Sequence, residues 1–328
     1  MPLPDRAQKI VHRAIDLAIV PLVSEKLVVT GFWRSGTTWI LQQAAYAIGA
    51  KTIFEPLAPS SGNFWADRPF SAHQADREMY MPLSTADLGK KASVIIEAAL
   101  NGRGHTGFAF FCRKSPMEAF RTRTVSKFTR AGFLLKDMIA NSTAKFIHVR
   151  RHPGAVYASL KSVDWDWSIN DCSLKRLYGG VRADEPPEIR SIRHQLLAND
   201  YSPLRRVAAL WALSERSAHL AAQADDGSRV LEISYSDLLT RQASLTTALS
   251  TLGFDLKARP DPARVSPVTS ASRHMAGTEE RLHSWQNELS LAEKEELRAI
   301  TTDLFPEMAH VFWEPSGDPL PLGKSSSG

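Results

Sequence analysis

The sequence predicts a doubly wound α/β fold, in which a mainly parallel sheet is flanked by helices in a single domain with long lid loops. Short β-rich runs alternate with helical stretches along the 328 residues, as in βαβ units. The 43% hydrophobic and 23% charged fractions exclude wholesale disorder and fibrous folds. We expect an amphipathic N-terminal helix within residues 1–26 that packs on the domain, a main domain at 27–315 and a flexible tail at 316–328.

The first expected elements are a helix, a strand, a loop and a second helix. Residues 5–20 carry apolar groups at helical spacing and predict the amphipathic helix. Residues 27–30 are a short β-rich run, and the segment from Thr37 to Ile48 is predicted as a helix that ends at Gly49. Further β-rich runs predict strands at residues 52–54, 108–112, 145–149 and 229–233.

Three long regions do not fit the sheet pattern. Loops of such length are usually functional lids or segments without fixed structure. They cover residues 56–90, 163–200 and 258–288. A capping box of Ser290 and Glu293 then opens a terminal helix that reaches about Leu304.

The charge of the chain indicates which kinds of binding partner to expect. Forty basic against 35 acidic residues give a net charge of +5, which favours an anionic partner. The basic residues are spread along the chain without a dense run, which argues against a nucleic-acid partner.

Cys112 and Cys172 form neither a disulfide framework nor a zinc-site spacing, so we expect a reducing compartment and no metal. The longest early apolar stretch, residues 18–23, is far shorter than the ~20 residues of a transmembrane helix, which favours a cytoplasmic protein.

Residues 31–38, Gly-Phe-Trp-Arg-Ser-Gly-Thr-Thr, have the two glycines of a P-loop at the correct separation between a strand and a helix. Such a loop points backbone N–H groups and a helix N-terminus at one spot and makes an anion site, so the sheet is expected to be of the P-loop type. Thr37 stands where the Walker lysine would be, and no clear strand ends in an acidic residue that would help to hold Mg²⁺. ATP hydrolysis is therefore disfavoured. Arg34 lies inside the loop, either solvated or in contact with an anionic group beyond the first phosphate.

A second anion site is predicted at residues 145–159, which form a strand, a turn and the start of a helix. Arg151 at the turn and Ser159 two helical turns later can converge on one phosphate, the first as a fork donor and the second as a hydroxyl donor. The sequence therefore predicts two separate anion sites.

These sites resemble those of the sulfotransferases that use 3′-phosphoadenosine-5′-phosphosulfate (PAPS). Residues 34–39, Arg-Ser-Gly-Thr-Thr-Trp, match the family's 5′-phosphosulfate loop, while Trp33 departs from the usual proline. Residues 233–238 look like the family's Y-E-D-L segment. The residues that match its 3′-phosphate motif in type and spacing are Arg151, Pro153 and Ser159. The three motifs stand in the family order, and the resemblance covers about residues 27–315.

The resemblance implies that PAPS is the co-substrate, that adenosine 3′,5′-bisphosphate (PAP) is a product and that no metal is needed. The residues that it assigns to the 5′-phosphosulfate are Arg34, Ser35, Gly36, Thr37 and Thr38. It places Trp39 and Tyr235 beside the adenine. The residues that it assigns to the 3′-phosphate are Arg151 and Ser159. Arg273 is either a surface arginine or the basic residue of a C-terminal loop that closes over this phosphate.

Sulfuryl transfer through a loose transition state needs positive charge at the equatorial oxygens, a donor at the leaving oxygen and a base on the acceptor. Arg34 and the loop amides suit the first need. Lys114 follows the run at 108–112, where the family has a lysine at a strand end, and it is either the leaving-group donor or an exposed lysine. The cytosolic phenol and steroid branch uses a histidine two residues after that lysine as its base, and Pro116 stands there in this chain.

Glu55 is the candidate base, because the branch with the tyrosylprotein and heparan-type enzymes and many bacterial relatives uses a glutamate after its second strand. Phe54 and the aromatic loop would give its carboxyl an apolar surround. A structural ion pair is the alternative role. His73 and His105, in or beside the first long loop, are competing bases, as is His148, which lies mid-strand and is expected in the core.

We therefore expect a PAPS-dependent sulfotransferase of the glutamate-base branch that sulfates a hydroxyl, or less readily an amine, of a small-molecule, lipid or glycoside acceptor. Trp65, Trp165 and Trp167 either line an acceptor pocket or pack under the loops. One alternative is a P-loop kinase or NTPase, which requires Mg²⁺-dependent binding of ATP. The other is a non-catalytic nucleotide-binding protein. No pattern in the sequence indicates an oligomeric state.

Overall fold

The computed structural model describes residues 23–58, 81–83, 90–104, 107–113, 115–163, 202–240, 243–260 and 282–313, with the single positions 14, 79 and 190. The helix expected at residues 5–20, apart from Ala14, and the tail expected at 316–328 lie outside the described residues. Most of the three long loops lies outside them as well.

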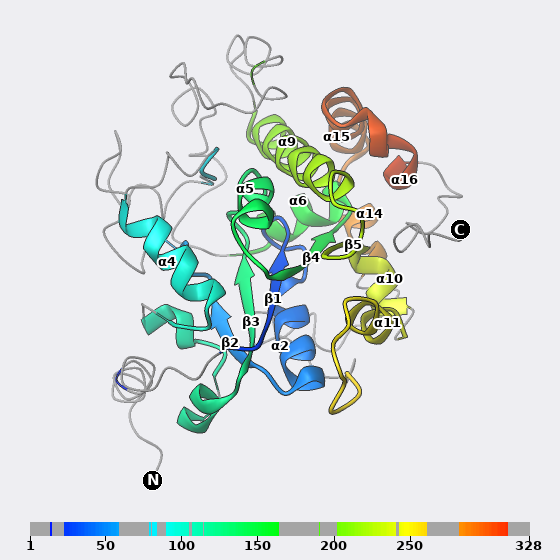
Figure 1. Cartoon of the computed structure of the whole chain (residues 1–328). Helices are drawn as coiled ribbons and strands as arrows, with labels where there is room; N and C mark the ends of the chain where they lie inside the picture. The colour runs from blue at the N-terminus through cyan, green and yellow to red at the C-terminus, as the bar shows by residue number, and fades with distance from the viewer. Residues whose placement is uncertain are drawn as a thin grey trace.

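In the described part of the chain, five parallel strands form one sheet in the order β2-β3-β1-β4-β5 (Figure 1). Their bounds are β1 Glu25–Thr30, β2 Lys51–Phe54, β3 Arg123–Phe128, β4 Lys145–Arg150 and β5 Val230–Ser234. The chain starts in the middle of the sheet, builds the β2 and β3 side first and then crosses to β4 and β5. The predicted α/β class with a mainly parallel sheet is thus confirmed.

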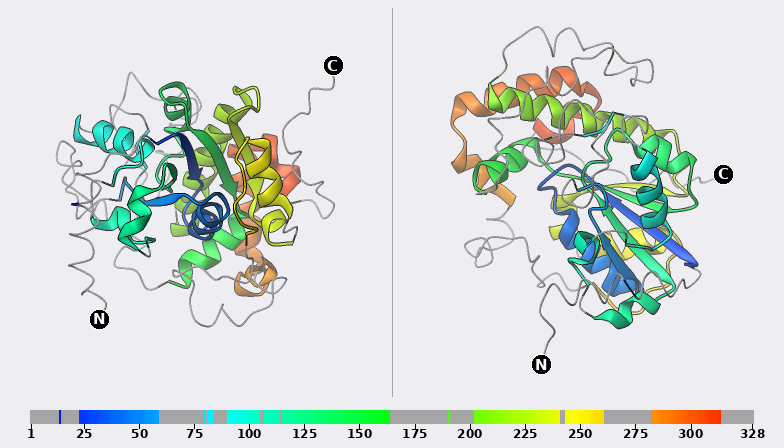
Figure 2. Two further views of the ribbon diagram at one scale, coloured as in Figure 1. Left: turned by 60° about the horizontal axis from the view of Figure 1, so that its bottom comes forward. Right: turned by 90° about the vertical axis from the view of Figure 1, so that its left-hand side faces the viewer.

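Helices cover both faces of the sheet (Figure 2). The helices that share one core are α2 Thr37–Ile48, α10 Tyr235–Thr240 and α11 Ala243–Thr251. Those that share the other core are α4 Lys90–Leu100, α5 Leu135–Ala140, α6 Pro153–Lys161, α9 Pro203–Gln223, α14 Trp285–Glu288 and α15 Leu291–Leu304. Shorter turns are η4 Gly107–Phe110, η5 Pro116–Phe120, η7 Pro306–Met308 and α16 Ala309–Trp313. Val28 packs into the second core and its neighbours Leu27 and Val29 into the first, because successive strand side chains point to opposite faces.

The predicted bounds of two helices are confirmed. α2 runs from Thr37 to Ile48, and Gly49 ends it with φ 65. α15 begins after Ser290, whose hydroxyl accepts from the Glu293 N–H while the Glu293 carboxylate accepts from the Ser290 N–H. Both boundaries are fixed by interactions between residues that lie close in the sequence, which is why they are visible in it.

The strand predicted at 108–112 is wrong, because this segment begins with the 3-10 helix η4. The strand that the prediction missed is β3, which lies between β2 and β1. The apolar run suggested a strand, but it folds as a turn in which the Arg113 guanidinium lies over the Phe110 ring. β3 escaped prediction because several of its residues are polar and yet buried, namely Thr124, Ser126 and Lys127.

Candidate active site

Both predicted anion sites lie at the carboxyl ends of β1 and β4, which are neighbours in the middle of the sheet. α2 follows β1 and packs on one face, whereas α6 follows β4 and packs on the other. In doubly wound sheets, ligands bind in the crevice where such connections leave in opposite directions. The topology therefore brings both loops to the edge at which a nucleotide is expected.

The glycines of the first loop are required by close contacts. A Cβ atom on Gly31 would lie 2.4 Å from the Val149 carbonyl oxygen, so the loop can pass β4 only without a side chain. Gly36 has φ 83, precedes the first turn of α2 and lies under Tyr235, whose ring would be 2.1 Å from an added Cβ. The loop therefore runs closely against β4 and α10 and ends at a helix N-terminus, which is an anion-binding geometry.

The two predicted anion sites are joined by hydrogen bonds. Nε of Arg34 donates to the Ser159 hydroxyl at 2.9 Å. Nη1 of Arg151 donates to the Arg34 carbonyl oxygen at 2.8 Å. Arg34 has φ 65, a conformation that is uncommon outside glycine and often marks a functional site. The sequence predicted Arg34, Arg151 and Ser159 as parts of two sites, and the fold makes them one continuous site.

The Ser35 hydroxyl supplies a test of whether the loop suits an anion. It is fully buried and has no hydrogen-bond partner among the residues that the structure describes. A buried hydroxyl without a partner is costly, and a phosphate or sulfate oxygen would satisfy it. Together with the loop amides and the guanidinium groups of Arg34 and Arg151, this donor set fits the phosphates of PAPS.

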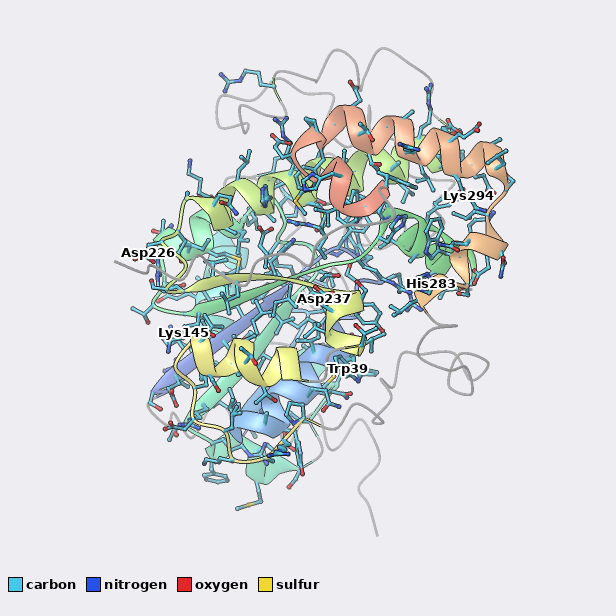
Figure 3. The ribbon with its side chains drawn as sticks, turned by 90° about the vertical axis from the view of Figure 1, so that its right-hand side faces the viewer. Trp39, Lys145, Asp226, Asp237, His283 and Lys294 are labelled. Atoms are coloured by element: carbon cyan, nitrogen blue, oxygen red, sulfur yellow. The ribbon has the colours of Figure 1, made fainter. Side chains whose placement is uncertain are left out.

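Two aromatic residues that were predicted beside the adenine take different positions. Tyr235 begins α10 and lies against Gly36, with the Arg151 guanidinium 5.0 Å from its ring centre. Trp39 is on the first turn of α2 and 8% exposed, and it packs in the core shared by α2, α10 and α11. Figure 3 shows Trp39 next to α10, on which Asp237 is also labelled. Tyr235 therefore borders the anion site directly.

Lys127, near the end of β3, is a site residue that sequence reasoning missed. Its Nζ donates to the hydroxyl of the loop residue Thr38 at 2.8 Å and lies 2.9 Å from Oε1 of Glu55. It also lies over the Phe54 ring, 4.2 Å from its centre. Lys114 lies outside the described residues, and the run before it is no strand. The signal for Lys127 was a lysine in a run of β-forming residues, which was lost because β3 itself was not recognised.

Glu55 is held rigidly beside this lysine. Its Oε1 accepts from the Thr129 hydroxyl at 2.7 Å, and its Oε2 accepts from the Thr129 N–H at 3.1 Å. Glu55 has φ 41, and its side chain is buried. A non-glycine residue with positive φ costs about 1–3 kcal/mol and persists where the surroundings hold it, often at active sites. The structure thus brings Glu55, Lys127 and the phosphate loop together.

The histidines proposed as competing bases divide into two groups. His148 is fully buried, and both ring nitrogens are used: Nδ1 lies 2.9 Å from the Thr30 hydroxyl and Nε2 lies 3.1 Å from Oε2 of Glu215. Because the Glu215 carboxylate can only accept, Nε2 carries a proton, and the Thr30 hydroxyl is the partner of Nδ1. His148 is therefore a core histidine. His73 and His105 lie outside the described residues.

His152 lies next to Arg151 and ties the site to the C-terminal helix. Its Nδ1 accepts from the Gly154 N–H at 3.1 Å and so caps α6, while its Nε2 donates to the Phe312 carbonyl oxygen at 2.9 Å. The ring stacks on Trp285. Burial, with the nearby charges of Arg151 and His283, lowers the pKa of His152 to about 4 against the opposing hydrogen bond to Phe312. The ring is thus neutral at neutral pH.

Cys112 is close enough to Glu55 and Lys127 to interact with their charges. Burial raises the pKa of its thiol to about 12, although the charge of Lys127 acts in the opposite direction. The thiol is therefore protonated at neutral pH, and Cys112 is not an activated nucleophile.

The described ranges contain neither a candidate metal centre nor a candidate membrane-spanning helix. No group of three or more His, Cys, Asp and Glu side chains that could hold a metal ion occurs among these residues. In the same ranges, no helix has the length and apolar character needed to cross a bilayer. Arg273, predicted to close over the 3′-phosphate, lies outside them.

The chain matches no protein-family model and no curated protein. Among solved structures, it is similar to a sulfotransferase domain from the curacin biosynthetic pathway, with 16% identity, a TM-score of 0.45 and coverage of 85% of this chain and 97% of that one. It is also similar to a sulfotransferase domain from the Synechococcus PCC 7002 olefin synthase, with 15% identity, a TM-score of 0.46 and coverage of 85% and 94%. A sulfotransferase from Mycobacterium tuberculosis H37Rv gives 14% identity, a TM-score of 0.39 and coverage of 87% and 81%. These likenesses are distant, so the functional proposal rests on the residues of the site.

Proposed function

We propose that the protein is a sulfotransferase that moves a sulfuryl group from PAPS to a hydroxyl, or less readily an amine, of a small-molecule, lipid or glycoside acceptor, and releases PAP. The observation that carries the proposal is the pair of hydrogen bonds from Arg34 to Ser159 and from Arg151 to Arg34. Because these bonds join the P-loop to the turn after β4, one ligand with two phosphates can reach both. PAP is such a ligand.

In this proposal the loop binds the 5′-phosphosulfate and the turn after β4 binds the 3′-phosphate. The residues that hold the 5′ group are Arg34, Ser35, Gly36, Thr37 and Thr38. The residues that hold the 3′ group are Arg151, Ser159 and, from outside the described residues, Arg273. Tyr235 and Trp39 border the adenine. Two observations support these roles: the Ser35 hydroxyl has no hydrogen-bond partner within the described ranges, and Tyr235 contacts Gly36.

Lys127 is proposed as the donor to the leaving oxygen, in preference to Lys114. The support is its hydrogen bond to Thr38, which holds the ammonium group against the loop that would carry the phosphosulfate. As the bond between sulfur and the bridging phosphate oxygen breaks, negative charge grows on that oxygen. An ammonium group already in place there stabilises the charge without reorganisation.

Glu55 is proposed as the general base. The new bond forms between the acceptor oxygen and sulfur, the bond from sulfur to the phosphate oxygen breaks, and the acceptor proton passes to a Glu55 carboxylate oxygen. Oε2 suits this step, because among the described residues it accepts a hydrogen bond only from the N–H of Thr129, whereas Oε1 already serves Lys127 and the Thr129 hydroxyl. The ion pair with Lys127 places the proposed base and the proposed leaving-group donor in the same site.

Isothermal titration calorimetry tests this function directly. The protein is expected to bind PAP without a metal ion and to bind ATP weakly with or without Mg²⁺. Tighter binding of ATP in the presence of Mg²⁺ would refute the proposal and favour a P-loop kinase or NTPase. Arg151→Ala is expected to weaken PAP binding about ten- to hundredfold, because it removes a charge-assisted contact with the 3′-phosphate.

A further inference from the structure

A single buried carboxylate lies between the two phosphate-binding segments. Glu215 is on α9 and only 1% exposed. Its Oε1 accepts a hydrogen bond from the backbone N–H of Phe32, at the start of the P-loop, at 3.2 Å. Its Oε2 accepts from Nε2 of His148 at 3.1 Å and from Nε of Arg150 at 3.2 Å, both near the end of β4. Each oxygen thus holds one of the two segments.

These contacts close a ring of bonds around the site. Arg151 directly follows Arg150, and its Nη1 donates to the carbonyl oxygen of Arg34 at 2.8 Å. Arg34 stands two residues after Phe32. The ring therefore runs from Glu215 through the loop, across to Arg151 and back through Arg150. Since these groups are buried or partly buried, neither segment can move relative to the other without breaking a hydrogen bond in a region of low dielectric.

We infer that Glu215 is a positioning residue that sets the separation of the two phosphate-binding segments. The inference rests on the proposed function, because a doubly phosphorylated nucleotide is the ligand that needs both segments at a fixed distance. A ligand that engages two linked sites makes its second contact at a high effective concentration, and it loses this gain when the geometry prevents both contacts at once. Glu215 acts through the Phe32 backbone and Arg150 and does not itself touch a phosphate.

A second, partly buried carboxylate provides a matched control. Glu232 of β5 forms an ion pair with Arg150 and lies 2.6 Å from Nδ1 of His219. Burial alone would raise the pKa of Glu232, but the charge of Arg150, with His219 and His148, lowers it to about 2. Its hydrogen bonds to described residues do not include one to the P-loop. Both carboxylates therefore neutralise Arg150, and Glu215 alone of the two also holds the loop.

Three variants separate positioning from charge balance. Glu215→Gln keeps the shape of the side chain and removes its charge. Glu215→Asp keeps the charge but shortens the reach by one C–C bond, ~1.5 Å, so it cannot serve both segments as before. Because Glu215→Asp leaves Arg150 with an anionic partner, it keeps the test open if Glu215→Gln does not fold. Glu232→Gln removes a partly buried charge from the same arginine without touching the loop.

The first measurement compares three ligands by calorimetry: PAP, adenosine 5′-monophosphate and adenosine 3′-monophosphate. In both Glu215 variants, the affinity for PAP is expected to fall roughly tenfold more than the affinity for either monophosphate. In Glu232→Gln, PAP is expected to lose no more than the monophosphates. Equal losses for all three ligands in the Glu215 variants would overturn the inference, because they would mean a general structural role.

The second measurement needs no ligand. Hydrogen–deuterium exchange of the nucleotide-free protein is expected to be faster than wild type in peptides that cover residues 31–36 and 150–153 of Glu215→Asp, and unchanged there in Glu232→Gln. Wild-type exchange in both peptides of Glu215→Asp would overturn the inference. If the wild-type protein bound none of the three nucleotides, the proposed function would fail, and exchange would still decide whether Glu215 couples the two segments.

Discussion

Glu55 and Lys127 form a buried ion pair, and the proposed function makes Glu55 the base and Lys127 the donor to the leaving oxygen. The pair also explains the unusual backbone of Glu55, since Thr129 and Lys127 hold its carboxylate while the φ of 41 turns the chain out of β2. A sequence run of strand, glutamate and proline indicated this residue, but its partners come from β3 and the segment after it. Residue-scale chemistry at this site therefore depends on a strand that was not foreseen.

Glu55→Gln tests the base at this scale. We expect PAP affinity to stay near the wild-type value, because the carboxylate does not touch the nucleotide in the proposal, and turnover of labelled PAPS to fall about 10²- to 10⁴-fold. Calorimetry gives the first quantity and transfer of labelled sulfate gives the second. Glu97→Gln, at an exposed position of α4, is the control that should keep both. Wild-type turnover in Glu55→Gln would return the role to His73 or His105.

At the scale of elements, the P-loop packs closely against α10 at Gly36, which lies against the Tyr235 ring. Gly36 and Gly227 both have φ 83, so alanine at either position carries the strain of a left-handed conformation, about 1–2 kcal/mol. A Cβ on Gly36 would lie 2.1 Å from the Tyr235 ring, whereas one on Gly227 meets nothing within 4 Å. The two positions thus differ by the ring contact.

Gly36→Ala is therefore expected to lower the free energy of unfolding by more than Gly227→Ala does, and chemical denaturation checks the difference. Tyr235→Ala in the Gly36→Ala background should recover part of the loss, because it removes the ring that the new methyl group meets. Equal destabilisation by the two glycine substitutions would contradict the packing of Tyr235 on the loop.

Some helices and strands could be predicted from the sequence, and others could not. The bounds of α2 and α15 follow from glycine and capping signals within a few residues, and the structure confirms them. The run at 108–112 has strong β propensity and yet folds as η4, while the polar strand β3 takes the place in the sheet. Ser126 shows why: its hydroxyl donates to the Ala99 carbonyl oxygen at 2.8 Å, a partner from α4 that makes a buried polar strand residue acceptable. The β propensity of the residues in β3 gives no information about this hydrogen-bond partner in α4.

Across the whole molecule, His152 links the turn that carries Arg151 to the C-terminal helix α16. The ring is neutral in the fold, with its pKa lowered from 6.5 to about 4 by burial and by the charges of Arg151 and His283, against the hydrogen bond to Phe312. An unfolded chain would bind a proton at His152 below pH 6.5, and the folded chain would not until about pH 4. The contribution of His152 to stability is therefore complete above pH 6.5 and is lost as the pH falls from 6.5 to about 4.

His152→Asn tests this dependence. Asparagine can still cap α6 but does not titrate, so the variant is expected to lose less stability than wild type between pH 6.5 and 4.5. Urea denaturation at several pH values measures the slopes, and comparing slopes cancels the other groups that titrate in this range. Identical slopes in wild type and His152→Asn would contradict a neutral buried ring.

The sequence by itself determined the parallel α/β class and the ends of α2 and α15, and it predicted an anion-binding loop and a second anion motif, because each depends on residues within about one loop or two helical turns of one another. Tertiary structure alone decided that the segments of the two predicted anion motifs are hydrogen-bonded to each other, that Lys127 donates to Thr38 and that Glu215 holds both segments. The pairs behind these facts are 125, 89 and 183 residues apart in the chain. Contacts at such separations depend on strand order and on which face each helix covers, and local periodicity does not encode either.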